Sequence, residues 1–209
     1  RLGNSEFVEA LKYTPGVHPN RQGGSWSDSE IYMRGFDNTN IAIMINGIPV
    51  NDLESRSVYW SNWASISDVA AVVQSQRGLG ASKVSNPSVG GTINIITKDP
   101  VNNSFQVSST MSNVNGDTWE QYMGANASLV SKDNVYGIAV YQSYRNRNPY
   151  DVDGDSFSEI GKLNMNTFGL RAYYRPTQFS RLNIEYHTKK KKRSIDENHI
   201  IKLSERVIN

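Results

Sequence analysis

Three aspartates spaced like the ligands of a calcium-binding loop are the residues of this chain that come closest to a metal site. Asp151, Asp153 and Asp155 alternate along a short segment that also contains Gly154. Carboxylates at alternate positions bind Ca²⁺ in the EF-hand loop, but that loop requires glycine at its sixth position, where this chain has Ser156. The segment is therefore a calcium-site candidate that departs from the template.

The residue sets that support catalysis are missing from the sequence. The chain has no cysteine, which excludes disulfide scaffolds, cysteine-ligated zinc and thiol nucleophiles. His18, His187 and His199 stand far apart, so there is no helical histidine pair of the kind that binds zinc. The sequence shows no recognisable serine–histidine–aspartate arrangement of the kind that forms a catalytic triad. The sequence therefore predicts neither an enzyme nor a resident cofactor.

Large aromatic residues gather in loop-like stretches beside a few charged residues. The members are Glu54, Arg56, Tyr59, Trp60 and Trp63, with Trp26 in an earlier loop. Aromatic faces beside polar groups suit the binding of a sugar, a peptide or a siderophore. The alternative is that these rings fill packing contacts, as large aromatic side chains usually do.

Composition narrows the class of protein. The 209 residues are 37% apolar, and no apolar run is long enough (about 18 residues) to cross a bilayer as a helix. Barrel strands carry a weaker signal, which that test does not address. The net charge of +2 is small, and the basic run 189–193 lacks interleaved aromatic residues. The sequence therefore does not predict a nucleic-acid partner.

The first half of the sequence predicts a small α+β domain. Asn4 and Ser5 can cap a short helix whose apolar residues include Phe7, Val8 and Leu11, and Pro15 and Gly16 stop it. A loop is expected over residues 18–29. Asn46-Gly47 between two apolar runs predicts a hairpin, because both residues tolerate positive φ. A second short helix leading into a strand is expected over residues 65–73, and another strand over residues 91–97.

Four short motifs follow one another through this half. They are YMRGFDN (32–38), MINGIPVND (44–52), QRGLGAS (76–82) and PSVGGTINIITK (87–98). In this order and spacing they resemble the plug domain of TonB-dependent outer-membrane receptors, in the form common in Bacteroidetes. The resemblance implies a gated importer of the bacterial outer membrane. In such an importer the plug fills a barrel, ligand binds on the outer face, and force from TonB loosens the plug.

The resemblance also implies roles for single residues. Arg34 in MRGF and Arg77 in QRGLG stand where the family has arginines that latch the plug to barrel glutamates, since guanidinium binds a carboxylate in a bidentate way. The alternative is that both arginines are solvated or pair within the plug. The glycines of the motifs are expected to serve the backbone; these are Gly35, Gly47, Gly78, Gly90 and Gly91.

From Ser104 onward, apolar and polar residues alternate with period two in five successive segments, with tyrosines near their ends. This is typical of outer-membrane barrel strands, although an antiparallel sheet with one solvated face has the same period. The resemblance favours the barrel. Short connections at 131–134 and 176–178 alternate with longer ones, so we expect residues 146–165 to form an extracellular loop.

The predicted organisation is a plug domain over residues 1–98, the first five strands of an incomplete transmembrane β-barrel over 99–188, and an atypical basic tail over 189–209. Five strands cannot close a barrel, since plugged transporters need about 22. Ile200, Leu203 and Val207 are spaced as in a helix. We expect the tail to be either out-of-frame translation or an ordinary basic extracellular loop.

The resemblance implies TonB, outer-membrane lipid and an imported ligand as partners. The ligand would be a siderophore, vitamin, glycan or peptide, and a surface lipoprotein is a further candidate partner. A signal peptide and the segment that contacts TonB are expected upstream of Arg1. The alternative function is a soluble plug-derived binding or interaction module without transport. That module would stay monomeric, whereas a barrel piece aggregates through its edge strand.

Overall fold

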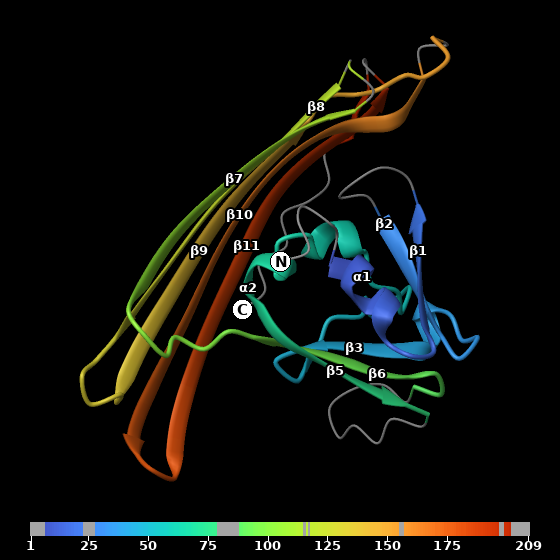
Figure 1. Cartoon of the computed structure of the whole chain (residues 1–209). Helices are drawn as coiled ribbons and strands as arrows, with labels where there is room; N and C mark the ends of the chain where they lie inside the picture. The colour runs from blue at the N-terminus through green and yellow to red at the C-terminus, as the bar shows by residue number, and fades with distance from the viewer. Residues whose placement is uncertain are drawn as a thin grey trace. The chain divides into compact units, whose positions relative to one another are not determined.

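The computed structural model describes residues 7–22, 28–78, 88–114, 116, 118–154, 157–196 and 199–201. The chain divides into two compact units, Arg1–Lys98 and Asp99–Asn209, which follow one another along the colour bar of Figure 1. Trp26, Asp155 and residues 79–87, which include parts of two motifs, lie outside the described residues. None of the helices in the described part has the length and apolar character needed to cross a membrane.

The first unit begins with the short helix that the sequence predicted. α1 (Phe7–Ala10) continues directly into the 3-10 turn η1 (Leu11–Tyr13), and Phe7, Val8 and Leu11 are buried. The helical segment ends before Pro15, because proline has no N–H to continue the ladder. Gly16 then reverses the chain with a φ of 76°.

An antiparallel ribbon follows where the sequence predicted a loop. β1 (Val17–Gln22) pairs with β2 (Asp28–Met33), so the loop prediction over residues 18–29 is wrong for both strand segments. Ile31 and Met33 are fully buried and anchor β2. The proline in β1 suggested a loop, but a two-stranded ribbon leaves one edge of each strand free of ladder bonds, where proline is tolerated.

Four strands form the main sheet of this unit, in the order β4-β3-β6-β5. Their bounds are β3 (Ile41–Ile45), β4 (Ile48–Pro49), β5 (Ala70–Arg77) and β6 (Gly91–Thr97). β3 and β6 run parallel, and the other neighbours are antiparallel. The predicted hairpin at Asn46-Gly47 is confirmed, with φ of 52° and 83° at the two turn residues.

Short helical turns complete the core of the first unit. η2 (Asn38–Asn40) precedes β3, while η3 (Trp60–Trp63) and α2 (Ile66–Val69) lie in the crossover from β4 to β5. Trp60 is 4% exposed and stacks on Phe7 with ring centroids 5.6 Å apart. The core therefore joins the first helix to the crossover, with isoleucines of β2, β3 and β6 packed between them.

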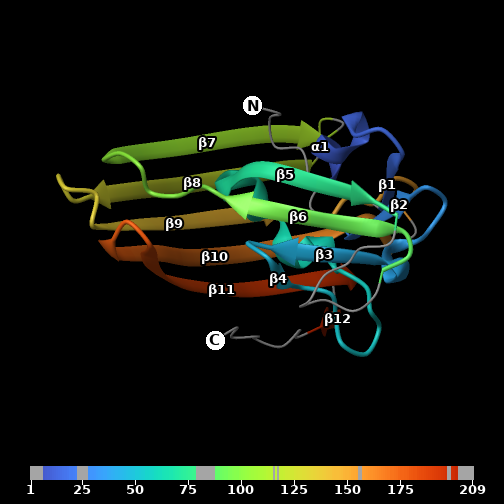
Figure 2. The same ribbon diagram turned by 90° about the horizontal axis from the view of Figure 1, so that it is seen from below.

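The second unit is one antiparallel sheet in which sequence neighbours are also spatial neighbours, in the order β12-β11-β10-β9-β8-β7. Figure 2 shows the long strands side by side. Their bounds are β7 (Ser104–Val114), β8 (Thr118–Val130), β9 (Tyr136–Arg147), β10 (Phe157–Thr177), β11 (Ser180–Asp196) and β12 (His199–Ile201). The predicted fold class was an α+β domain followed by antiparallel strands of an incomplete barrel, and the structure confirms the α+β domain and the antiparallel strands, which form an open sheet.

The two faces of this sheet differ in chemistry. Register places Val107, Ala125, Gln142, Phe168 and Thr188 in one row on one face, which we call the apolar face. This face carries large apolar side chains that are exposed: Phe105, Val107, Met111, Trp119, Met123, Leu129, Tyr136, Ile138, Phe168, Tyr174, Leu182, Ile184 and Tyr186. The alternate residues form the polar face. An extensive exposed apolar surface of this kind is expected only where another apolar phase covers it.

Two strand ends differ from the sequence prediction. β10 is 21 residues long and begins at Phe157, so the long loop predicted over 146–165 shrinks to residues 148–156. β11 continues past residue 188 through the lysine run, in unbroken register with β10 from Leu182 to Ser194. In the lysine run, the side chains of β11 are polar on both faces of the sheet. The sequence therefore lacks the alternation of apolar and polar residues there, although the backbone still pairs with β10. Leu203 and Val207 of the predicted tail lie outside the described residues.

Candidate functional site

The arginines of two separate motifs converge at one corner of the first unit. A Cβ on Gly16 would lie 3.9 Å from both Cγ of Arg34 and Cδ of Arg77, and one on Gly78 would lie 3.5 Å from Nη1 of Arg34. The backbone N–H of Arg34 also donates to the carbonyl of Gly16 (3.0 Å). Within the described residues, neither guanidinium makes a hydrogen bond or ion pair. Two exposed cations side by side repel each other and favour a shared anionic partner.

A tight turn presents the first of these arginines. Arg34 and Gly35 have φ of 54° and 83°, and the flanking Met33 and Phe36 exchange two backbone hydrogen bonds of 2.9 and 3.0 Å. This is a type I′ turn, in which positive φ is strained for a residue other than glycine, asparagine or aspartate. The strain points to a role for the arginine side chain at this position.

The motif glycines allow the motifs to pack on one another. A Cβ on Gly91 would collide with Sδ of Met33 and would lie 2.5 Å from the carbonyl oxygen of Gln76. One on Gly90 would lie 2.8 Å from Cβ of Phe36. The fourth motif thus lies directly against the first and third. Close backbone approach explains why glycine occurs at these positions.

The Asn46-Gly47 turn is fastened to β6 by polar side chains. Nδ2 of Asn46 donates to Oγ1 of Thr97, whose N–H donates back to Oδ1 of Asn46, both at 2.9 Å. The N–H of Gly47 donates to Oδ1 of Asn94 (3.0 Å). The second and fourth motifs are therefore also joined, and the four motifs form one connected structural unit.

The predicted aromatic group divides into core and surface residues. Trp60 is buried and Trp63 packs against the core, which fits the packing alternative rather than a ligand-facing role. Tyr59 is 50% exposed, and Glu54 and Arg56 are exposed as well. Of the predicted ligand-facing residues that the structure describes, these three remain candidates.

Asn51 and Asp52, which the sequence analysis did not assign, shape the loop that presents these candidates. The N–H of Ile43 donates to Oδ1 of Asn51 (2.8 Å), and Nδ2 of Asn51 donates to the carbonyls of Ile41 (3.0 Å) and Arg56 (2.8 Å). Oδ1 of Asp52 accepts from the N–H groups of the next turn. The Asn-Asp pair after a strand is a turn signal that could have marked them.

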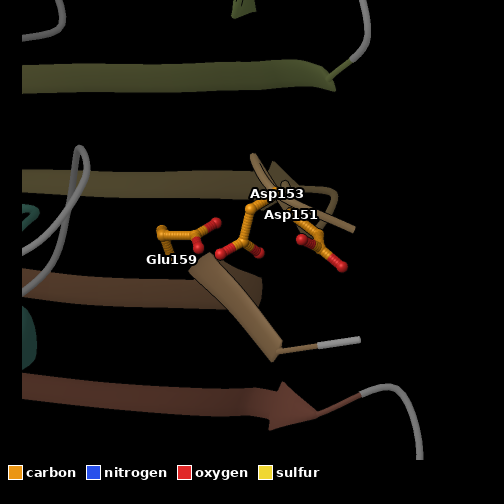
Figure 3. Close-up of side chains that lie close together, drawn as sticks. All are labelled: Asp151, Asp153 and Glu159. Atoms are coloured by element: carbon orange, nitrogen blue, oxygen red, sulfur yellow. The ribbon is translucent and has the colours of Figure 1, made fainter. Parts of the chain in front are cut away.

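An acidic cluster lies at the connection between β9 and β10, as Figure 3 shows. One carboxylate oxygen from each of Asp151, Asp153 and Glu159 lies within 4.8 Å of the others. Carboxylates suit Ca²⁺, and Glu159 joins the set in place of Asp155, which lies outside the described residues. Oε2 of Glu159 and Oδ1 of Asp151 already accept from the N–H groups of Val152 (2.8 Å) and Gly154 (2.7 Å). The cluster is a cation-site candidate to which no role is assigned.

The polar face of the second unit contains an ion-pair network at the start of the unit. Oδ1 of Asp99 lies 2.7 Å from Nη2 of Arg171 and 3.0 Å from Nη2 of Arg181. Arg171 also lies 3.5 Å from a carboxylate oxygen of Glu185. Asp99 therefore ties the segment before β7 to both β10 and β11.

Basic residues outnumber acidic residues on the polar face of β8 to β11. The described basic residues are Arg145, Arg147, Arg171, Arg175, Arg181, Lys189 and Lys191, against Glu120, Glu159 and Glu185. Arg147 is 1% exposed; it pairs with Glu120 at 3.9 Å and donates to the carbonyl of Gly161 at 3.0 Å. A surface with this balance attracts anions.

Comparison with known proteins finds a family model that matches the first unit and solved structures that share the fold of both units. Residues 1–92 match the model of the TonB-dependent receptor plug domain. No curated protein sequence matches the chain.

Three solved structures are similar to the chain. The siderophore receptor PirA from Pseudomonas aeruginosa is 19% identical, with a TM-score of 0.62. The match covers 92% of this chain and 34% of the PirA chain. The ferric citrate transporter FecA in its unliganded form is 16% identical, with a TM-score of 0.70. The match covers 92% of this chain and 30% of the FecA chain. The copper transporter OprC is 14% identical, with a TM-score of 0.68. The match covers 94% of this chain and 30% of the OprC chain. The chain spans about a third of the length of these structures.

Proposed function

We propose that this chain, whose residues 1–92 match the model of the TonB-dependent receptor plug domain, is part of a receptor that takes up a ligand across the bacterial outer membrane. Ligand binds on the outer face, and force from TonB releases the plug so that ligand passes. The observation that carries the proposal is the direct succession of a plug domain and a sheet with an exposed apolar face. That face also argues against the soluble interaction module, which would leave it in water.

The paired arginines support a latch within this receptor. Arg34 and Arg77 converge from two motifs and present adjacent guanidinium groups, so one or two glutamates of the barrel would bind them. An exposed ion pair contributes about 0–1 kcal/mol, and bidentate geometry raises this. Such contacts hold a plug at rest yet break under a directed force.

The charge of the polar face supports an anionic ligand. Seven described arginines and lysines lie on this face of β8 to β11 against three glutamates. Fixed positive charge raises the local concentration of an anion and its rate of association. The loop that presents Glu54, Arg56 and Tyr59 supplies the candidate contacts on the plug. No catalytic group takes part in this mechanism.

Uptake by cells tests the proposal. The full-length protein is expressed in cells that lack other receptors of this kind, with and without TonB, and labelled ferric citrate and a labelled anionic ferric siderophore are supplied. Accumulation of at least one anionic complex that requires both the protein and TonB is the expected result. Accumulation that is equal with and without TonB contradicts the proposed mechanism.

A further inference from the structure

Three lysines gather at one end of the apolar face of the sheet β7 to β12 of the second unit, which we call the wall. The register of β10 and β11 pairs Lys190 with Asn166 and Lys192 with Asn164. Lys162 lies on β10, two residues before Asn164. All three lysines therefore lie on the same face as the exposed apolar side chains, and all three are exposed. Diagonal neighbours on adjacent strands are about 7–8 Å apart, so the ammonium groups can reach one common ligand.

The lysines begin where the apolar side chains end. On β11 the apolar residues of this face stop at Tyr186, and on β10 they stop at Phe168. Lys190 lies four residues beyond Tyr186, about 13 Å along the strand. With a strand tilt of about 40°, this is about 10 Å of height. If the apolar residues up to Tyr186 lie in hydrocarbon, the backbone of Lys190 lies just beyond the layer of lipid headgroups, which is about 5–8 Å thick on each side, and the long lysine side chain can extend back into that layer.

The surroundings of the lysines on this face are neutral. Asn164 and Asn166 lie between the lysines and β9, and Nδ2 of Asn164 donates to Oη of Tyr144 (2.9 Å). Among the described residues on the apolar face of β7 to β11 up to Lys192, there is no aspartate or glutamate; Asp196 follows at the end of β11, beyond the three lysines. The three positive charges therefore outnumber the carboxylates at this end of the face.

We propose that Lys162, Lys190 and Lys192, with the amide of Asn166, bind the phosphate of an outer-leaflet lipid headgroup. The long lysine side chains lie along the apolar surface and extend their charges into the headgroup layer. A phosphate has several acceptor oxygens and can be shared by the three ammonium groups. This inference rests on the proposed position of the wall in the outer membrane.

Native mass spectrometry of the full-length protein in phosphatidylcholine nanodiscs tests the site. The probe is bisphosphorylated lipid A, and its dephosphorylated form is the comparison. Each lysine near an anionic lipid surface favours binding about fivefold, so the K162Q/K190Q/K192Q variant should retain the probe on the order of a hundredfold less. The K162R/K190R/K192R variant keeps the charges and should bind as the parent does. Lys132→Gln, at the opposite rim, is the control for loss of a charge elsewhere.

Two outcomes overturn the proposal. One is equal retention of lipid A by the parent and the glutamine variant. The other is competition by soluble glucosamine phosphate as effective as that by lipid A, which would make the site one for free phosphate. Failure of the protein to enter nanodiscs would instead contradict the proposed membrane position itself. The result that supports the proposal is weaker retention of phosphorylated lipid A by the glutamine variant, with unchanged retention of the dephosphorylated form.

Discussion

Replacement of Asn51 tests how the candidate ligand loop is held on the plug. The side chain of Asn51 accepts from the N–H of Ile43 and donates to the carbonyls of Ile41 and Arg56. It thereby continues the backbone pairing of β3 beyond β4. Ile43 is 1% exposed, so water cannot replace the lost partner of its N–H without local opening.

The expected effect follows from these three hydrogen bonds. Asn51→Ala leaves a buried N–H unsatisfied, which costs about 1–3 kcal/mol, and each further lost bond adds roughly 1 kcal/mol or less where water can reach. The free energy of local opening should fall by about 2–3 kcal/mol. Amide hydrogen exchange at Ile43 and in residues 52–57 should then be on the order of a hundredfold faster.

Hydrogen–deuterium exchange of the full-length protein is the assay. Asn51→Asp keeps an acceptor for the Ile43 N–H but cannot donate when ionised, so its exchange should fall between the parent and Asn51→Ala. Asn38→Ala, which removes another amide from the same unit, is the control and should leave this loop unchanged. Parent-like exchange in Asn51→Ala would refute the reasoning, because the loop would then be held by other contacts.

Four further changes have defined outcomes. The Arg34→Gln/Arg77→Gln double variant should loosen the plug by about 1–2 kcal/mol, measured as faster plug exchange without TonB; parent-like exchange contradicts the latch. Gly91→Ala should fail to assemble or lose several kcal/mol in denaturant titration, because φ is 141° and the added Cβ meets Met33; a fully stable variant contradicts this packing. Asp99→Asn should lower the unfolding midpoint of the wall, since charge-assisted bonds contribute about 1.5–3 kcal/mol each, and an unchanged midpoint refutes it. Hydrogen bonds from Thr39 hold the pKa of Asp37 below its ordinary value, so the stability that this cap contributes is present at neutral pH and is lost as pH falls through the folded-state pKa; Asp37→Asn should remove that pH dependence, seen in exchange of residues 38–40.

Local patterns of sequence predicted the elements that local physics decides. Asn46-Gly47 identified its hairpin because positive φ at both turn residues is a property of those two residues. Alternation identified the barrel-type strands wherever one face is apolar. It failed in the lysine run of β11, where both faces are polar and only pairing with β10 maintains the strand. It failed also at β1, where pairing with β2 outweighs a loop-like composition.

The sites were less predictable because they join residues distant in sequence. The resemblance assigned Arg34 and Arg77, but their convergence beside Gly16 depends on the packing of the first and third motifs. Asp99 meets Arg171 and Arg181 only through the register of β10 and β11. The aromatic cluster showed the limit of composition, since Trp60 belongs to the core while its neighbour Tyr59 is exposed. The Bacteroidetes form and the lipoprotein partner remain predictions.

The orientation of the wall in the outer membrane is the most direct test of the account. These 209 residues contain no cysteine, and single cysteines are placed in a full-length protein kept free of other cysteines, at Val152 in the β9–β10 connection and at Lys132 in the β8–β9 turn of the opposite rim. Intact cells expressing the full-length protein are treated with a membrane-impermeant maleimide. The account predicts labelling of Val152→Cys on intact cells and of Lys132→Cys only after the outer membrane is permeabilised. Equal labelling of both positions on intact cells, or labelling of Lys132→Cys alone, would contradict it.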